Sequence, residues 1–157
     1  MISFFTKTTS KLSKSNINDI LRIKESHWSY GMRSQRKFFI ENIKPNDLHN
    51  LLYYRKALIG YTSLRNSTYK DINNKTFKYL HFDTIIIKKK FRKRRFSYLM
   101  MLMNNFTIKE KSKTAILFCK KNMRSFYMNF EWKVLRKNIK LKHKSFPNKL
   151  TMVYNFK

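Results

Sequence analysis

The sequence predicts a single α/β domain in which helices flank one mixed β-sheet. Three observations lead to this fold class. The chain has 157 residues, the size of one domain, and 42% of them are hydrophobic, enough for a packed core. Segments with strand-type and helix-type periodicity follow in the order strand, two helices, three strands, helix, strand, helix, two strands. This order is not a βαβ series, and no linker divides residues 1–157.

The first half of the chain is expected to contain a strand, two helices and two further strands. Asn16 or Asn18 can cap the first helix, Gly31 interrupts the helical pattern, and Pro45 follows the second helix. The residues of the first helix that recur at helical spacing are Ile20, Ile23, His27 and Trp28. The expected elements are strand Met1–Thr6, helix Ser34–Ile43, strands His49–Arg55 and Ala57–Arg65, and a polar connection Asn66–Lys75.

The second half begins with Phe77–Ile87, the longest strand candidate, which is rich in aromatic and β-branched residues. The basic run Lys88–Arg95 then leads into a helix, and Thr114–Cys119 is apolar throughout, as expected of a central strand. The helix has apolar residues at i, i+3, i+4 and i+7 spacing, namely Phe96, Leu99, Met100, Met103 and Phe106 or Thr107. The remaining expected elements are a short helix at Asn122–Phe130 and strands at Lys133–Lys142 and Leu150–Phe156.

The charge of the chain is strongly positive. Lys and Arg number 36 against 8 Asp and Glu, which gives a formal net charge of +28. Such a charge is typical of proteins that bind nucleic acid or an anionic membrane. The lysines are scattered along the whole chain, however, and abundant Lys, Asn, Ile, Phe and Tyr are the residues with AT-rich codons. A solvated lysine surface is therefore favoured, and nucleic-acid binding stays open as an alternative.

Several other classes of site and location are not expected. Cys119 is the only cysteine, which excludes a disulfide framework, and no His/Cys/Asp/Glu cluster has the spacing of a metal site. No apolar run reaches the roughly 20 residues of a membrane span, and residues 1–7 lack the apolar stretch of a secretory signal. A cytoplasmic protein without a bound metal is the expectation.

Three segments between Phe77 and Trp132 carry a family resemblance. Asp83–Met100 is similar to a strand followed by an R/Q-x-x-G-x-G/A loop and a helix, Ile116–Cys119 to the next core strand, and Phe126–Trp132 to an F-Y-x-x-x-G-W/F segment. In this order they resemble the GNAT superfamily of acyl-CoA-dependent N-acyltransferases. Upstream, Ala57–Leu64 resembles the strand that often carries xxIGxxxL in this family. The resemblance implies a mixed, mostly antiparallel sheet flanked by about four helices, with acetyl-CoA as co-substrate.

The loop before the second-half helix is the expected cofactor site. A helix N-terminus presents unpaired N–H groups and a partial positive charge, which together bind a pyrophosphate. The family resemblance places the pantetheine and phosphates of the cofactor on Ile85, Ile86, Ile87, Arg92, Lys93, Arg94, Arg95, Phe96 and Ser97. The charge of the run Lys88–Arg95 alone favours a solvated basic turn, whereas the order of the flanking elements favours the cofactor site.

The sequence departs from the family pattern at its glycines. Arg95 and Ser97 stand where the loop usually has glycine or alanine, and Glu131 stands where glycine usually precedes Trp132. Glycine lets a phosphate approach the backbone closely. Because the chain contains only two glycines, drift explains these changes, but loss of cofactor binding is equally compatible.

The resemblance also implies candidate catalytic and acceptor residues. Tyr127 matches the tyrosine that donates to the sulfur of coenzyme A, and His81 or Asp83 matches the position of a general base. The candidate acceptor residues, in the segment that covers the acceptor side in this family, are His27, Trp28, Tyr30 and Gln35. For each of these residues, the alternative interpretation is an ordinary structural role in the core or at the surface.

The resulting functional hypothesis is an N-acyltransferase that moves an acetyl group from acetyl-CoA to a primary amine by direct attack in a ternary complex. A small molecule such as an amino sugar is the preferred acceptor, because a chain with 8 acidic residues offers little to a polycationic one. The two rival hypotheses are a basic nucleic-acid-binding module and a catalytically inactive relative that still binds coenzyme A.

Overall fold

The computed structural model of the protein describes residues 1–71, 73–135 and 149–156. The chain forms two compact units, one made of Met1–Arg65 with Thr84–Asn104 and the other of Asn66–Asp83 with Asn105–Lys157. We call them the first and the second unit, and each is described by itself. A single domain over residues 1–157 stays a prediction.

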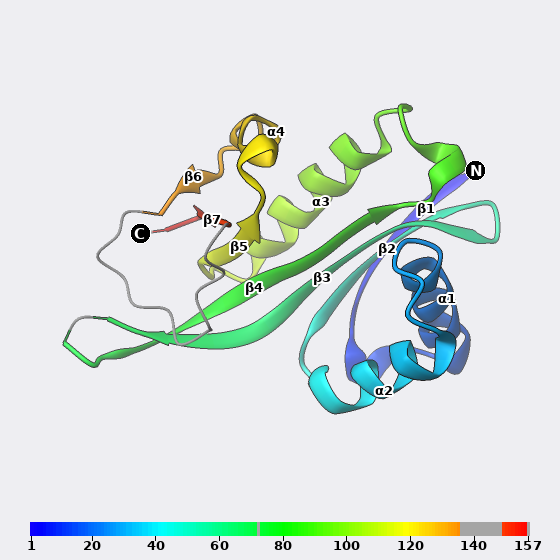
Figure 1. Ribbon diagram of the computed structural model, residues 1–157, viewed down its shortest axis with the longest axis horizontal. Coiled ribbons are helices and arrows are strands. Elements are labelled where there is room, and N and C mark those ends of the chain that lie inside the picture. Colours follow the sequence, from blue (N-terminus) through cyan, green and yellow to red (C-terminus); the bar gives the residue numbers. More distant parts are fainter. Residues whose placement is uncertain (72, 136–148, 157) are drawn as a thin grey trace. The chain divides into compact units, whose positions relative to one another are not determined.

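Within the described ranges the chain forms seven strands and four α-helices, drawn in Figure 1. The strands are β1 (Ile2–Thr8), β2 (Leu48–Tyr54), β3 (Ala57–Lys70), β4 (Thr76–Ile87), β5 (Ala115–Cys119), β6 (Lys133–Val134) and β7 (Leu150–Tyr154). The helices are α1 (Lys14–Glu25), α2 (Met32–Asn42), α3 (Phe96–Glu110) and α4 (Arg124–Met128). No helix in this part of the chain has the length and apolar character to cross a membrane.

The strands pair in the order β1-β2-β3-β4-β5-β7-β6. The β1–β2, β2–β3, β5–β7 and β6–β7 pairs are antiparallel, whereas β4 and β5 are parallel. The predicted fold class, a mixed and mostly antiparallel sheet with about four helices, is therefore confirmed.

The first unit packs apolar side chains on both faces of its strands. The cluster beside α1 and α2 contains Leu51 of β2 and Ile86 of β4, while their neighbours Leu52 and Ile87 belong to a second cluster with Met100 of α3. This division follows from the strand geometry, which points successive side chains to opposite faces. Gly60 lies in the second cluster, where an added Cβ would come within 3.1 to 3.2 Å of Ile87, Leu52 and Met100.

The second unit is held by aromatic side chains. Tyr69 is buried, with its ring centroid 5.1 Å from that of Phe77 and 5.9 Å from that of Tyr79. This packing extends β3 to Lys70, so the polar connection expected at Asn66–Lys75 is wrong over its first five residues. The expected strand Lys133–Lys142 is confirmed for β6, and its residues 136–142 lie outside the described part of the chain.

Helix α1 begins earlier than expected because its cap is Ser13. The Ser13 hydroxyl accepts a hydrogen bond from the Asn16 N–H at 3.1 Å, and the Asn16 side chain accepts one from the Ser13 N–H at 3.2 Å. This reciprocal arrangement is a capping box. The helix ends at Glu25, so His27 and Trp28 lie in the connection to α2 and not on the helix.

The orientation of α3 differs from the expected one. Of the predicted apolar face, Met100 and Thr107 are buried, whereas Phe106 is 59% exposed and Leu99 and Met103 are half-buried. Instead, α3 buries Met100, Met101, Asn104, Asn105, Thr107 and Ile108. Apolar residues occur on all sides of this helix, so their spacing could not identify the buried side.

Candidate functional site

The basic loop after β4 is anchored in the first unit by one aromatic residue. Phe91 is buried, and its ring centroid lies 5.7 Å from that of Tyr54 and 6.1 Å from that of Phe96. At the start of the loop the Lys88 N–H donates to the Ile59 carbonyl at 2.8 Å. The four cationic residues between Phe91 and α3 are all exposed, namely Arg92, Lys93, Arg94 and Arg95. The loop therefore presents its positive charge to solvent directly before α3.

Two residues of this loop have left-handed backbone conformations, Lys93 with φ 63° and Arg95 with φ 60°. This conformation costs a residue with a Cβ roughly 1 to 2 kcal/mol, whereas glycine adopts it readily. Arg95 stands at the expected glycine position, so the glycine-type backbone is present without the glycine. Its carbonyl accepts from the Leu99 N–H at 3.1 Å, which places Arg95 directly at the N-terminus of α3.

Arg92 connects the end of β4 to the segment after α1. Its Nε donates to the Ile87 carbonyl at 3.1 Å, and its Nη2 lies 2.9 Å from Nδ1 of His27. Because a guanidinium only donates, His27 Nδ1 must accept, and the ring is neutral with its proton on Nε2. Burial, and next the charge of Arg92, lower the pKa of His27. An expected cofactor residue and an expected acceptor residue are thus in direct contact.

The other expected acceptor residues lie around the connection between α1 and α2. Gln35 is buried, and its Nε2 donates to the Trp28 carbonyl at 2.8 Å. The same carbonyl accepts from the Tyr30 N–H at 2.8 Å, while the Tyr30 side chain is 71% exposed. Gln35 therefore stabilises the connection between α1 and α2, and the Tyr30 side chain extends from this connection into solvent.

Tyr127, on α4 of the second unit, is a buried tyrosine with an uncommitted hydroxyl. Its ring centroid lies 6.3 Å from those of Phe82 and Trp132. Burial, and next the charge of a Cys119 thiolate, raise the pKa of Tyr127 to about 12, so the hydroxyl keeps its proton at neutral pH. It makes no hydrogen bond with any residue that the structure describes, and it can donate one to a ligand.

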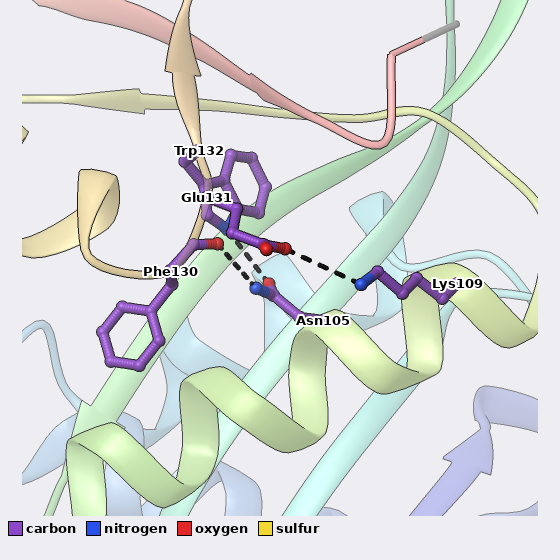
Figure 2. A network of polar contacts seen from close by, with 5 residues as sticks. All are labelled: Asn105, Lys109, Phe130, Glu131 and Trp132. Carbon is purple, nitrogen blue, oxygen red and sulfur yellow. Dashed lines mark hydrogen bonds and ion pairs between the residues drawn. The ribbon is translucent and has the colours of Figure 1, made fainter.

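The turn after α4, whose residues Phe130, Glu131 and Trp132 are drawn with Asn105 and Lys109 in Figure 2, is held by several hydrogen bonds. The Phe130 and Trp132 N–H groups both donate to the Tyr127 carbonyl, at 2.9 and 3.3 Å. Asn105 of α3 bridges the two ends of the turn: its Nδ2 donates to the Phe130 carbonyl at 2.9 Å, and its Oδ1 accepts from Trp132 Nε1 at 3.0 Å. Between them, Glu131 has φ 65° and a carboxylate 3.7 Å from Lys109 Nζ.

His81 and Asp83, the expected bases, lie on the part of β4 that belongs to the second unit. β4 and β5 pair at Leu80 with Ala115 and at His81 with Ile116, and Asp83 continues β4 after the last pair. Both side chains are half-buried, and the His81 ring meets that of Phe118 edge-on at 5.4 Å. Ile85, Ile86 and Ile87 complete β4 in the first unit, with Ile86 and Ile87 buried.

Asn105, which holds the turn beside Tyr127, could not be found from the local patterns of the sequence. The residues it binds lie 25 and 27 positions away along the chain, beyond the reach of local patterns. A signal was nevertheless present, because Asn104 and Asn105 form a polar pair inside an otherwise apolar helix. A polar pair in such a helix indicates buried hydrogen bonds.

Comparison with known proteins bears on the fold. No protein-family model matches the sequence, and no curated protein matches it. Among solved structures, ElaA of Escherichia coli matches with a TM-score of 0.73 and 14% identity over 98% of this chain and 99% of that chain. An acyl-CoA N-acyltransferase of Pseudomonas aeruginosa matches with a TM-score of 0.73 and 8% identity over the same shares.

A third match is the PaiA N-acetyltransferase of Thermoplasma acidophilum, whose structure was solved with coenzyme A. It matches with a TM-score of 0.61 and 13% identity over 98% of this chain and 99% of that chain. These structures match the chain almost from end to end. Because the sequence identities are only 8% to 14%, the similarity establishes the fold alone. The chain has the fold of the GNAT superfamily of acyltransferases, as its motifs predicted.

Proposed function

We propose that the protein is an N-acetyltransferase that transfers an acetyl group from acetyl-CoA to a primary amine. One observation carries the proposal. Arg95 and Glu131 stand at the two positions where the family motifs have glycine, and their φ angles of 60° and 65° are those that glycine adopts freely. Both motifs thus keep their backbone conformation although the glycines are absent. The GNAT fold, present in an N-acetyltransferase solved with coenzyme A, supports the same proposal.

The residues of the first unit are suited to hold coenzyme A. The first N–H groups of α3 have no acceptor within the helix, and four exposed cations precede them. Arg92–Ser97 would bind the pyrophosphate there, and the backbone of Ile85–Ile87 would pair with the amides of pantetheine as an added strand does. The exposed Arg95 side chain makes no hydrogen bond or ion pair with the described residues, so its charge is available to a phosphate.

The chemistry assigned to the second unit uses Tyr127 and either His81 or Asp83. Acetyl-CoA supplies the thioester. The neutral acceptor amine attacks the carbonyl carbon, the carbon–sulfur bond breaks, and His81 or Asp83 takes the proton that the amine releases. Tyr127 retains its proton at neutral pH and donates it, or a hydrogen bond, to the departing sulfur. No residue of the chain becomes acylated in this sequence of steps.

The proposed acceptor is a small amine, such as an amino sugar, and its proposed contacts are His27, Trp28, Tyr30 and Gln35. A chain with 36 basic and 8 acidic residues repels a polycationic acceptor over most of its surface. The proposed location of the reaction is the cytoplasm.

Thermal unfolding with and without acetyl-CoA tests the proposal. A ligand that binds the folded state alone adds about 2.7 kcal/mol at a hundredfold excess over its dissociation constant. We expect acetyl-CoA to raise the melting temperature more than ATP does, and to do so in high salt, where nonspecific binding of polyanions is screened.

A screen of small amines for release of the coenzyme A thiol follows, with Tyr127→Phe as the variant that keeps the ring and removes the donor. Turnover that falls in this variant, while stabilisation by acetyl-CoA persists, supports the assigned role of Tyr127. Stabilisation without turnover on any amine indicates an inactive relative. An effect of acetyl-CoA no larger than that of ATP contradicts the proposal.

A further inference from the structure

Helix α3 exposes large apolar side chains along one side. Tyr98, Leu102 and Phe106 lie one helical turn apart along the same side, and they are 51%, 47% and 59% exposed. Leu99 and Met103 are half-buried beside them. We call these five residues the α3 outer face. On the inner side, Asn104, Asn105 and Thr107 are buried together with Met100, Met101 and Ile108, so α3 has apolar residues on its inner side as well as on its outer face.

Hydrogen bonds fix this orientation of the helix. In the first unit, Asn104 Oδ1 accepts from Asn50 Nδ2 at 3.2 Å and from the Thr62 hydroxyl at 3.1 Å. In the second unit, Asn105 is held by Phe130 and Trp132. Rotating α3 to bury the outer face would break these bonds in the protein interior. The outer face is therefore a lasting feature of the surface.

The distribution of charge around α3 is also unusual. Phe96–Ile108 comprises 13 residues without Asp, Glu, Lys or Arg, whereas the next longest such run, Ala57–Leu64, has 8. Charged residues flank this run directly on both sides. Lys93, Arg94 and Arg95 precede it and Lys109 and Lys111 follow it, all exposed, with Glu110 as the single acid. The outer face is thus an apolar strip with cations at each end.

We propose that the α3 outer face docks onto an anionic lipid bilayer surface. Apolar and aromatic side chains of an interfacial helix enter the boundary between headgroups and acyl chains, while flanking Lys and Arg attract anionic headgroups. The net charge of +28 favours this occupant over a second copy of the chain, because two such copies repel each other. The docked helix lies on the bilayer and does not cross it.

Co-sedimentation of the full chain with lipid vesicles tests the proposal. We expect binding to phosphatidylcholine vesicles that contain about one-third phosphatidylserine, and much weaker binding to phosphatidylcholine alone, since each flanking cation gains from the anionic surface. Leu102→Glu and Phe106→Glu are each expected to weaken the binding roughly tenfold or more, because each places a charge within the buried apolar strip.

Ile40→Glu is the matched control. Ile40 is an apolar residue of α2 that is 72% exposed, so this variant has the same loss of apolar surface and the same change of net charge outside the outer face. We expect it to retain nearly all binding. Unchanged far-UV circular dichroism and melting temperature would verify that all three variants are folded.

Three results would overturn the proposal. The first is a wild-type protein that does not sediment with anionic vesicles. The second is an equal loss of binding in Leu102→Glu and Ile40→Glu, which would assign the effect to charge alone. The third is a dimer in sedimentation equilibrium that Leu102→Glu dissociates, which would assign the outer face to a second copy.

Discussion

Two turns of this protein have the same backbone conformation and different surroundings. At Arg95 and at Glu131 a residue with a long charged side chain has a left-handed φ, of 60° and 65°. The Glu131 turn is closed on both sides by Asn105, which donates to the Phe130 carbonyl and accepts from the Trp132 indole, and the Glu131 carboxylate lies near Lys109. The Arg95 loop, Arg92–Ser97, is anchored through Arg92, which bonds to the Ile87 carbonyl and to His27, whereas the exposed guanidinium of Arg95 itself has no polar partner among the described residues. We infer that the Glu131 turn serves the structure and the Arg95 loop serves a ligand.

The largest expected effect concerns the support of the Glu131 turn. Asn105→Ala removes the partners of the Phe130 carbonyl and of the Trp132 indole N–H in the protein interior. Each unpaired group costs about 1 to 3 kcal/mol, so we expect a loss of about 4 kcal/mol in the free energy of unfolding. Urea denaturation measures it.

Asn42→Ala is the control for this effect. Asn42 also donates to a backbone carbonyl, that of Phe38 at 3.1 Å, but in an exposed setting. We expect the control to lose less than about 1 kcal/mol. Equal losses in the two variants would contradict the structural role of Asn105.

The second effect concerns the unit that holds the Arg95 loop. His49 is buried, with Nδ1 2.9 Å from the Tyr61 hydroxyl and Nε2 2.9 Å from that of Thr9. Burial is the main cause that lowers the pKa of His49 from 6.5 to about 4. Between these values the unfolded chain binds a proton that the folded chain excludes, so stability is complete above pH 6.5 and falls as the pH drops toward 4.

The expected loss is about 3 to 4 kcal/mol, from a pKa difference of about 2.5 at about 1.4 kcal/mol for each pH unit. Urea denaturation at a series of pH values measures it. His49→Gln cannot titrate, and we expect its stability to change less over this range. A slope as steep in the variant as in the wild type would show that His49 is not the cause.

The smallest effects concern the two left-handed residues themselves. Arg95→Gly relieves the left-handed conformation and is expected to raise the free energy of unfolding by about 1 kcal/mol. Glu131→Gly gives a smaller gain, because it also removes the contact with Lys109. Arg124, with φ −53°, is the control, and Arg124→Gly should destabilise by about 0.5 to 1 kcal/mol. Destabilisation by Arg95→Gly would contradict the inferred strain in the loop.

The order of strands and helices could be predicted from the sequence because it depends on local signals. A run rich in aromatic and β-branched residues predicted β4, an apolar run predicted β5, and the basic stretch marked the loop between β4 and α3. The end of β3 could not be predicted from local signals, because Tyr69 is held in the strand by packing against Phe77 and Tyr79 of β4. The buried side of α3 could not be predicted either, because the spacing of apolar residues does not identify one side of a helix that has apolar residues on all sides.

In the candidate site, too, local motifs could be predicted from the sequence, whereas contacts between distant residues could not. The motif positions located Arg95 and Tyr127, and the structure adds the left-handed backbone of the first and the protonated hydroxyl of the second. The contact between Arg92 and His27 joins residues 65 positions apart, so no local pattern could reveal it. The roles of His81 and Asp83 stay predictions.

Calorimetric titration with coenzyme A tests most directly whether the Arg95 loop is a ligand site. Arg55 provides a matched control, because it is an exposed arginine with φ 55° in the turn between β2 and β3. We predict that Arg95→Glu raises the dissociation constant roughly tenfold or more, since it replaces a phosphate-binding charge with a repelling one, and that Arg55→Glu leaves it nearly unchanged. Equal dissociation constants in the two variants would contradict the assignment of the loop to coenzyme A.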